Sequence, residues 1–178
     1  MNNIDLLKKQ VLFVDLDSAL IHTASGMLYP TDCCDFVINK EFIDKIALML
    51  PSLEFLFVIS NQLSIGRLIL EGEFIAKLSA ICEFARVYLE EKRFENIIVN
   101  HRYCTPSRCS HFLMPDTGML QDLCSLYDLT DKGCMLMVGG LSGKPKDISD
   151  IDRQCADNFS IDYIDICDFM NLKESYRQ

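Results

Sequence analysis

The stretch Val11-Leu12-Phe13-Val14-Asp15-Leu16-Asp17-Ser18 decides the fold class. An apolar run that ends in acidic residues is typical of a buried parallel strand at its carboxyl end, so we predict a strand over residues 10–16. Alternate residues of an extended segment point the same way. We therefore expect Asp15 and Asp17 to face one site.

The rest of the chain alternates between strand and helix patterns. Apolar runs predict strands over residues 55–59, 96–99, 134–138 and 162–166, and apolar residues in steps of three and four predict helices over 40–50, 71–91 and 118–127. A short extended piece at residues 27–29 predicts a small hairpin. Together these elements predict an α/β fold with one parallel sheet of about five strands and helices on both faces. Such sheets bind ligands beyond the carboxyl ends of their strands.

Length and composition restrict the class of protein. The 178 residues fit one domain over 1–178, and no apolar run approaches the ~20 residues that cross a bilayer. The N-terminus shows no signal-peptide pattern, and nine cysteines, an odd number, argue against a closed disulfide framework. We therefore expect a cytoplasmic or nuclear protein that is not secreted and has no membrane partner. The net charge of −9 argues against nucleic-acid binding, because Lys and Arg dominate contacts to phosphate.

Polar side chains follow the predicted strands. Asp15 is a candidate nucleophile toward phosphorus, Asp17 is a candidate general acid and base, and the pair attracts Mg²⁺. Ser60, followed by the amides of a helix start, is a candidate phosphate clamp. The alternative interpretations are a solvated acidic pair and an ordinary helix N-cap.

A glycine-containing segment, Gly139-Gly140-Leu141-Ser142-Gly143-Lys144-Pro145, follows the fourth predicted strand. Its glycines are too close together for a nucleotide-binding P-loop, and Pro145 stands where a Ser or Thr would hold Mg²⁺. We therefore reject a P-loop and a kinase activity.

Taken together, these segments resemble the haloacid dehalogenase (HAD) superfamily, and within it the polynucleotide kinase 3′-phosphatases, which are related to histidinol-phosphate phosphatases. The first motif of that family, Asp-x-Asp-Gly-Thr-Leu, is similar to residues 15–20, its second motif to residues 58–67, and its fourth-motif region to residues 137–153. The resemblance implies a Rossmann-like fold with a minimal or absent cap and a Mg²⁺-dependent aspartyl-phosphate mechanism. It also implies that Ser60 and Asn61 bind phosphate and that Ser25 and Arg67 contact the substrate.

Departures from the family pattern remove groups that the chemistry uses. Met114 stands where the third motif has a Lys, and Gly140 stands where the fourth motif has a metal-binding Asp. In the first motif, Ser18 and Ala19 replace Gly and Thr. One electrostatic stabiliser is worth about a hundredfold in rate, so losing two predicts catalysis slowed by up to ~10⁴-fold.

Other residues are candidates to repair the site. Lys144 or Lys146 could replace the missing Lys, against the alternative that both lie in a solvated loop. Asp152 matches an acidic position of the family and is a candidate Mg²⁺ ligand beside Asp15 and Asp17.

A segment rich in Cys and His follows the third predicted strand. His101, Cys104, Cys109 and His111 are candidate ligands of a structural zinc ion, because two Cys and two His make a tetrahedral zinc shell. Related heptose- and histidinol-phosphate phosphatases carry a Cys/His zinc loop at this place, with a different spacing. The alternative is a polar surface loop.

Two hypotheses about function follow. The first is a catalytically impaired family member, a pseudoenzyme that acts by binding or by assembly with a protein partner. The second is an active Mg²⁺-dependent phosphatase that hydrolyses nucleic-acid 3′-phosphates, as in DNA repair, or a small phosphoester. The net charge of −9 disfavours a nucleic-acid 3′ end.

Overall fold

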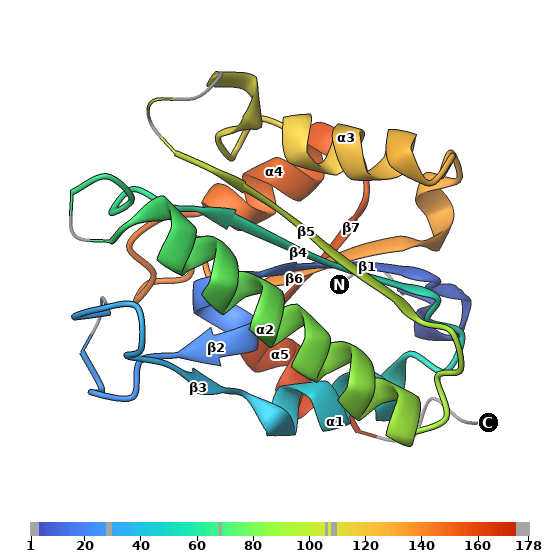
Figure 1. Cartoon of the computed structure of the whole chain (residues 1–178). Coiled ribbons are helices and arrows are strands. Elements are labelled where there is room, and N and C mark those ends of the chain that lie inside the picture. The colour runs from blue at the N-terminus through green and yellow to red at the C-terminus, as the bar shows by residue number, and fades with distance from the viewer. Residues whose placement is uncertain (1–3, 28–29, 68, 106, 108–109, 174–178) are drawn as a thin grey trace.

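The structure, a computed structural model, describes residues 4–27, 30–67, 69–105, 107 and 110–173. Its centre is a parallel sheet with the strand order β5-β4-β1-β6-β7 (Figure 1). The strands are β1 (Val11–Asp15), β4 (Phe55–Asn61), β5 (Ile98–Cys104), β6 (Met135–Gly139) and β7 (Asp162–Asp165). The predicted α/β fold with a five-stranded parallel sheet is therefore confirmed.

Strand β1 lies in the middle of the sheet because its side chains are apolar on both faces. Leu12 and Val14 pack into one hydrophobic core, and Val11 and Phe13 pack into a second core on the opposite face. All four are completely buried. This alternation gives each face of the sheet its own apolar surface for helices to cover.

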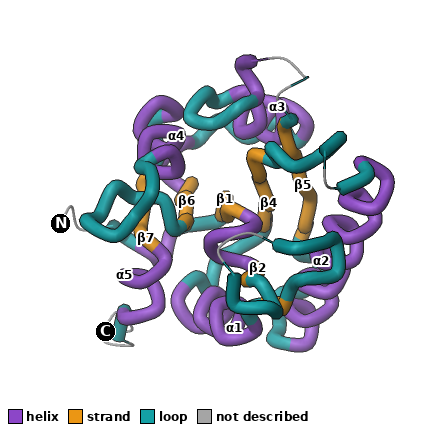
Figure 2. The backbone as a smooth tube through the Cα atoms, turned by 90° about the vertical axis from the view of Figure 1, so that its left-hand side faces the viewer, coloured by secondary structure: helices purple, strands orange, loops and turns teal. Residues whose placement is uncertain are grey.

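Helices cover both faces of the sheet (Figures 1 and 2). On one face lie α1 (Lys40–Met49), α2 (Glu71–Glu91) and α5 (Ile166–Asn171), and on the other lie α3 (Gly118–Leu126) and α4 (Ile151–Phe159). The sequence patterns predicted α1, α2 and α3 but neither α4 nor α5. None of the described helices is both long enough and apolar enough to cross a membrane.

A small antiparallel pair, β2 (Ile21–His22) and β3 (Val37–Ile38), follows β1. We call residues 21–38 the flap. Inside it, the backbone N–H of Thr31 and the hydroxyl of Ser25 donate to the carboxylate of Asp35 and lower its pKa to about 2. The extended piece predicted over residues 27–29 stays a prediction, because residues 28 and 29 lie outside the described residues.

Two strand boundaries differ from the predictions in ways that matter for the site. Strand β1 ends at Asp15, and residues Leu16–Leu20 form a π-helical turn, so Asp17 does not lie on an extended segment as expected. The turn forms because the carboxylate of Asp15 accepts the backbone N–H of Ser18 at 2.9 Å. Strand β5 continues to Cys104, five residues beyond the predicted end at 99, because its polar side chains lie on the edge of the sheet.

Candidate functional site

The candidate site lies at the carboxyl edge of the central strands. Because β4, β1 and β6 are parallel neighbours, their carboxyl ends meet at one edge. This edge brings together Asp15 from β1, Ser60 from β4 and the Gly139–Gly140 pair from β6. Residues 15, 60 and 140, which are far apart in the sequence, thus lie at the same edge of the sheet.

Asp15 is the residue at which the central strand β1 ends, and its carboxylate is almost completely buried. It is only 6% exposed, and its Oδ2 accepts the backbone N–H of Ser18. Burial raises the pKa of Asp15 well above the usual range, and the nearby charges of Asp152 and Asp17 raise it further. Without a cation, the carboxyl group of Asp15 therefore tends to keep its proton.

Asp17 lies in the turn after β1 and is exposed. Its Oδ2 accepts hydrogen bonds from Gln62 Nε2 at 2.5 Å and from Ser60 Oγ at 3.4 Å. Partial burial of the carboxylate raises the pKa of Asp17, while the positive charge of Lys77 acts in the opposite direction. A raised pKa and a fixed position both suit a group that gives a proton to a substrate and takes one from water.

Ser60 and Gln62 position Asp17. Ser60 is 1% exposed, and its Oγ accepts a hydrogen bond from Nε2 of Gln62 at 2.8 Å. The expectation of a helix start directly after Ser60 was wrong, because α2 begins only at Glu71. Sequence reasoning missed Gln62, although its place just after a predicted strand end was the available signal.

Asn61 does not extend toward the site. Its Nδ2 donates to the carbonyl oxygen of Met114 and its Oδ1 accepts the backbone N–H of Met114, each at 3.0 Å. Both ends of the Asn61 amide are therefore used to fix the segment that carries Met114. The predicted role of Asn61 in binding phosphate finds no support in this arrangement.

Met114 lies in the hydrophobic core, away from the carboxylates. It is 2% exposed and belongs to the cluster that contains Phe13 and Ile59. Its side chain thus brings no positive charge to the site, as its chemistry predicts.

The glycines after β6 leave room for two neighbouring side chains. A Cβ atom at Gly139 would collide with Asp152 Oδ2, and a Cβ atom at Gly140 would lie 2.8 Å from Ser18 Cβ. The backbone N–H of Gly140 donates to Ser18 Oγ at 2.8 Å. Ser18 therefore occupies the space that a side chain at position 140 would need.

Asp152 enters this space from the first turn of α4. It is completely buried, and its Oδ2 accepts the backbone N–H of Leu141 at 2.9 Å and lies 3.4 Å from Ser18 Oγ. Its Oδ1 is buried and has no hydrogen-bond partner among the described residues. Burial raises the pKa of Asp152 to about 6. An unpartnered carboxylate oxygen beside two further carboxylates fits a place where a cation binds.

The residues at this edge fit Mg²⁺ better than they fit a metal ion that protein ligands must enclose completely. Among the residues that the structure describes, no three His, Cys, Asp or Glu side chains already surround a common point as ligands. Mg²⁺ does not need such a cage, because it usually takes one or two carboxylates and keeps several waters. Asp15 and Asp17 offer two carboxylates, and Asp152 offers its free Oδ1.

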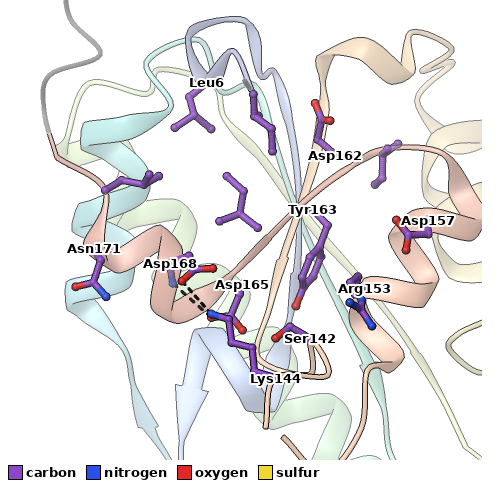
Figure 3. A pocket seen from close by; sticks show the side chains of 14 residues that line it. Leu6, Ser142, Lys144, Arg153, Asp157, Asp162, Tyr163, Asp165, Asp168 and Asn171 are labelled. Carbon is purple, nitrogen blue, oxygen red and sulfur yellow. Dashed lines mark hydrogen bonds and ion pairs between the residues drawn. The ribbon is translucent and has the colours of Figure 1, made fainter. Parts of the chain in front are cut away.

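The predicted surrogate Lys144 lies elsewhere. Its Nζ forms ion pairs with Asp165 at 2.6 Å and with Asp168 at 2.9 Å (Figure 3). These carboxylates raise the pKa of Lys144 and hold it in a pocket of about 720 Å³ along β7, which Asp15 and Asp17 do not line. The interpretation of Lys144 as a replacement for the missing Lys was therefore wrong, because two acidic residues outside the site bind it.

Three further candidate residues are not brought to the carboxylates by any described contact. Lys146 and Arg67 are exposed. Ser25 donates its backbone N–H and its hydroxyl to Asp35, both at 2.7 Å, and so stabilises the flap. Their predicted roles with the substrate are not supported by a contact in the described structure.

The predicted zinc ligands do not form a site in the described part of the chain. His101 and Cys104 lie within β5 instead of in a surface loop, and the Sγ of Cys104 donates to the carbonyl oxygen of Thr105 at 3.4 Å. The ring of His111 packs against Phe112, and Cys109 lies outside the described residues. Zinc thus gains no support.

Comparison with known proteins agrees with this geometry. A family model described as "Polynucleotide kinase 3 phosphatase" matches residues 10–168. D,D-heptose 1,7-bisphosphate phosphatase from B. bronchiseptica, solved with magnesium and phosphate, is similar in structure with a TM-score of 0.62 and 16% identity, over 86% of this chain and 78% of that chain. A protein from Mesorhizobium loti described as a putative HAD-like phosphatase is similar with a TM-score of 0.56 and 21% identity, over 86% of this chain and 69% of that chain. At such identities these two structures show a common fold alone, and no curated protein matches the sequence significantly.

Proposed function

Because this chain belongs to the polynucleotide kinase 3-phosphatase family of HAD-like phosphatases, we propose that it is a Mg²⁺-dependent phosphomonoester hydrolase that uses Asp15 as its nucleophile. Asp15 ends the central strand, and no described residue donates a hydrogen bond to its Oδ1. That oxygen is therefore available to attack phosphorus.

The proposed reaction has two steps. In the first, Asp15 Oδ1 forms a bond to phosphorus, the bond from phosphorus to the ester oxygen breaks, and Asp17 gives its proton to the leaving oxygen. In the second, Asp17 takes a proton from a water molecule, and the resulting hydroxide displaces phosphate from Asp15. Gln62 and Ser60 hold Asp17 in one orientation through both steps.

Asp15, Asp17 and Asp152 would hold the Mg²⁺ ion. When bound, Mg²⁺ supplies positive charge that offsets the carboxylates and the phosphoryl group together. Ser18 orients two of these carboxylates. Its backbone N–H donates to Asp15, and its hydroxyl donates to Asp152.

One observation carries the proposal. Gly140 lacks the carboxylate that the family pattern places there, yet Asp152 brings a buried carboxylate with an unpartnered Oδ1 to the same edge. The pKa of Asp15 is raised partly by Asp152, so the two groups are electrostatically close. Asp152, which matches an acidic position of the family, thus keeps a second element's carboxylate beside Asp15 although position 140 has none, and this supports a site that can still hold a cation.

The test is a phosphatase assay with Mg²⁺ and with a chelator. We expect phosphate release that requires Mg²⁺ and falls at least ~10⁴-fold in Asp15→Asn, because removing a nucleophile typically costs that much. Lys146→Met, a change at an exposed lysine, is the matched control and should leave the rate unchanged. Equal rates in the wild-type protein and Asp15→Asn would refute the proposal.

The substrate class is part of the same assay. The family name points to nucleic-acid 3′-phosphates, whereas the net charge of −9 repels polyanions and favours a small phosphomonoester. We propose the small phosphomonoester. Oligonucleotide 3′-phosphates hydrolysed faster than sugar phosphates at the same concentration would reverse this choice.

A second candidate function is phosphate-dependent binding without turnover. It is favoured by Met114, which brings no cation to the site. In this case the protein would bind Mg²⁺ and the phosphate analogue BeF₃⁻ at Asp15 but release no phosphate from any ester. The assay above and a BeF₃⁻ titration separate the two functions.

A further inference from the structure

A buried lysine, Lys77, lies in the second turn of α2. It is only 7% exposed, although lysine is almost never found buried unless it is paired. Among the described residues, none accepts a hydrogen bond from its Nζ or forms an ion pair with it. Its one described polar contact is a cation–π contact, with Nζ 4.9 Å from the ring centre of Phe36. The stem of Lys77 is thus buried while its ammonium keeps some access to solvent, where an anionic partner can reach it.

The flap covers Lys77 on the side of the candidate site. Phe36 belongs to the flap, and the charge of Lys77 also acts on Cys33 of the same segment. In Figures 1 and 2 the beginning of α2 lies beside the flap, above the carboxyl edge of the sheet. The charge of Lys77 is the strongest influence that favours the ionised form of Asp17. The ammonium therefore contacts the flap and lies near enough to Asp17 for its charge to act on that carboxylate.

The charges at the site do not balance without Lys77. Asp15, Asp17 and Asp152 bring three acidic groups, and a phosphomonoester adds up to two negative charges. Mg²⁺ offsets only two of these. Lys144 is bound by Asp165 and Asp168, so it is not available to the site.

Resting on the proposed function, we propose that Lys77 is the phosphate-binding cation of this site. Its Nζ donates a hydrogen bond to a non-bridging oxygen of the phosphoryl group that Asp15 attacks. The lysine thus reaches the substrate from α2 and from beneath the flap, in place of a cation at position 114. The ligand that this arrangement selects is a phosphomonoester dianion.

The experiment measures binding of inorganic phosphate to the full chain in the presence of Mg²⁺, by calorimetry and by ³¹P NMR. Lys77→Met and Lys77→Gln remove the charge, and Lys77→Arg keeps it. Lys40→Met is the matched control, because Lys40 is an exposed lysine that also makes a cation–π contact, with Nζ 5.4 Å from the ring centre of Phe84. Thermal unfolding identifies the variants that keep the fold.

We expect phosphate binding to weaken about tenfold or more in whichever neutral variant stays folded, since a hydrogen bond to a charged group is worth at least that factor. Lys77→Arg should keep most of the affinity, and Lys40→Met should bind phosphate like the wild-type protein. If Lys77 had only a structural role, replacing it would lower the melting temperature without producing this pattern of phosphate affinities. Unchanged phosphate affinity in a folded neutral variant, or an equal loss in Lys40→Met, would overturn the inference.

The outcome is separable from that of the proposed function. A protein that hydrolyses no ester but binds phosphate through Lys77 would support this inference while refuting turnover. An active, Asp15-dependent phosphatase whose phosphate affinity does not depend on Lys77 would support turnover and refute this inference. A wild-type protein that binds no phosphate in the presence of Mg²⁺ would overturn the inference.

Discussion

The two halves of the candidate site are built in different ways. On the side of β1 and β4, Asp17 is held by two side chains, and Asp15 is capped by the backbone of the following turn. On the side of β6, Gly140 has no side chain, and the carboxylate comes from Asp152 on α4 with one oxygen unpartnered. The comparison teaches that a carboxylate from a neighbouring helix can reach the β6 side of the site although the strand end itself carries none. The experiments below test this difference, starting with the largest expected effect.

Restoring the family's Lys at position 114, beside β4, should harm the protein. Met114→Lys would put an ammonium into an apolar cluster, and we expect a loss of about 3–5 kcal/mol in the free energy of unfolding, because the buried charge has no anion. Met114→Leu should cost less than ~1.5 kcal/mol. Urea unfolding measures both. A Met114→Lys protein of unchanged stability and higher phosphatase activity would show that position 114 can still reach the site.

The unpartnered carboxylate should make stability depend on pH. The pKa of Asp152 is raised by burial from 3.8 to about 6, so the folded protein binds more protons than the unfolded chain between these values. The metal-free protein should therefore lose stability as the pH rises from about 4 through about 6, by ~2–3 kcal/mol. Melting temperatures across this range, in chelator, measure the loss.

Two comparisons isolate the cause of that pH dependence. Asp152→Asn should weaken it, because the amide does not titrate while Asp15 and Asp17, whose pKa values are also raised, still do, and Mg²⁺ should reduce it, because the ion favours the ionised forms. A dependence that persists unchanged in Asp152→Asn would assign the effect to another group.

Ser18 and Gly140 should behave as a coupled pair. Gly140→Asp alone would force its Cβ against Ser18, and we expect a loss of about 1–3 kcal/mol. The double change Ser18→Gly with Gly140→Asp should recover at least ~1 kcal/mol of this, as contacting residues do in a double-mutant cycle. Additive losses would show that Ser18 does not occupy the space.

The smallest effect is expected at Lys144. Its ion pairs with Asp165 and Asp168 are partly exposed, so Lys144→Met should cost less than ~1 kcal/mol in stability. Because Lys144 lies outside the site, phosphate release should stay within about twofold of the wild-type rate. A large loss of activity would return Lys144 to the site.

The sequence predicted the fold well because buried strands and long amphipathic helices leave strong patterns. The central strand and α2 were evident from apolar runs and spacing. Helix α4 was missed because it is short and its buried face combines the polar Asp152 with Cys155, Ala156 and Phe159. Strand β5 was predicted too short because it lies at the edge of the sheet, where polar residues such as Arg102 are tolerated.

The candidate site was predictable only in part. Asp15, Asp17 and Asp152 could be named from motif positions, and the structure brings them to one edge. Lys77 could not, because a charged residue in a helix normally faces solvent, and its burial depends on a flap nearly forty residues earlier in the chain. The ion pairs of Lys144 could not be foreseen, because Asp165 and Asp168 come from a different element.

The contact between Ser18 and the backbone of Gly140 has a consequence for the history of the chain. Starting from the family pattern of Gly at 18 and Asp at 140, a Ser at 18 arriving first would have met the Asp side chain at close range. The replacement of Asp by Gly at 140 therefore had the easier path as the earlier step. Once Ser18 had filled the space and accepted the N–H of Gly140, a return of Asp at 140 was blocked. With Ser18 in place, an Asp at 140 would bring its Cβ against the Cβ of Ser18, so the family pattern at 140 requires a change at 18 as well.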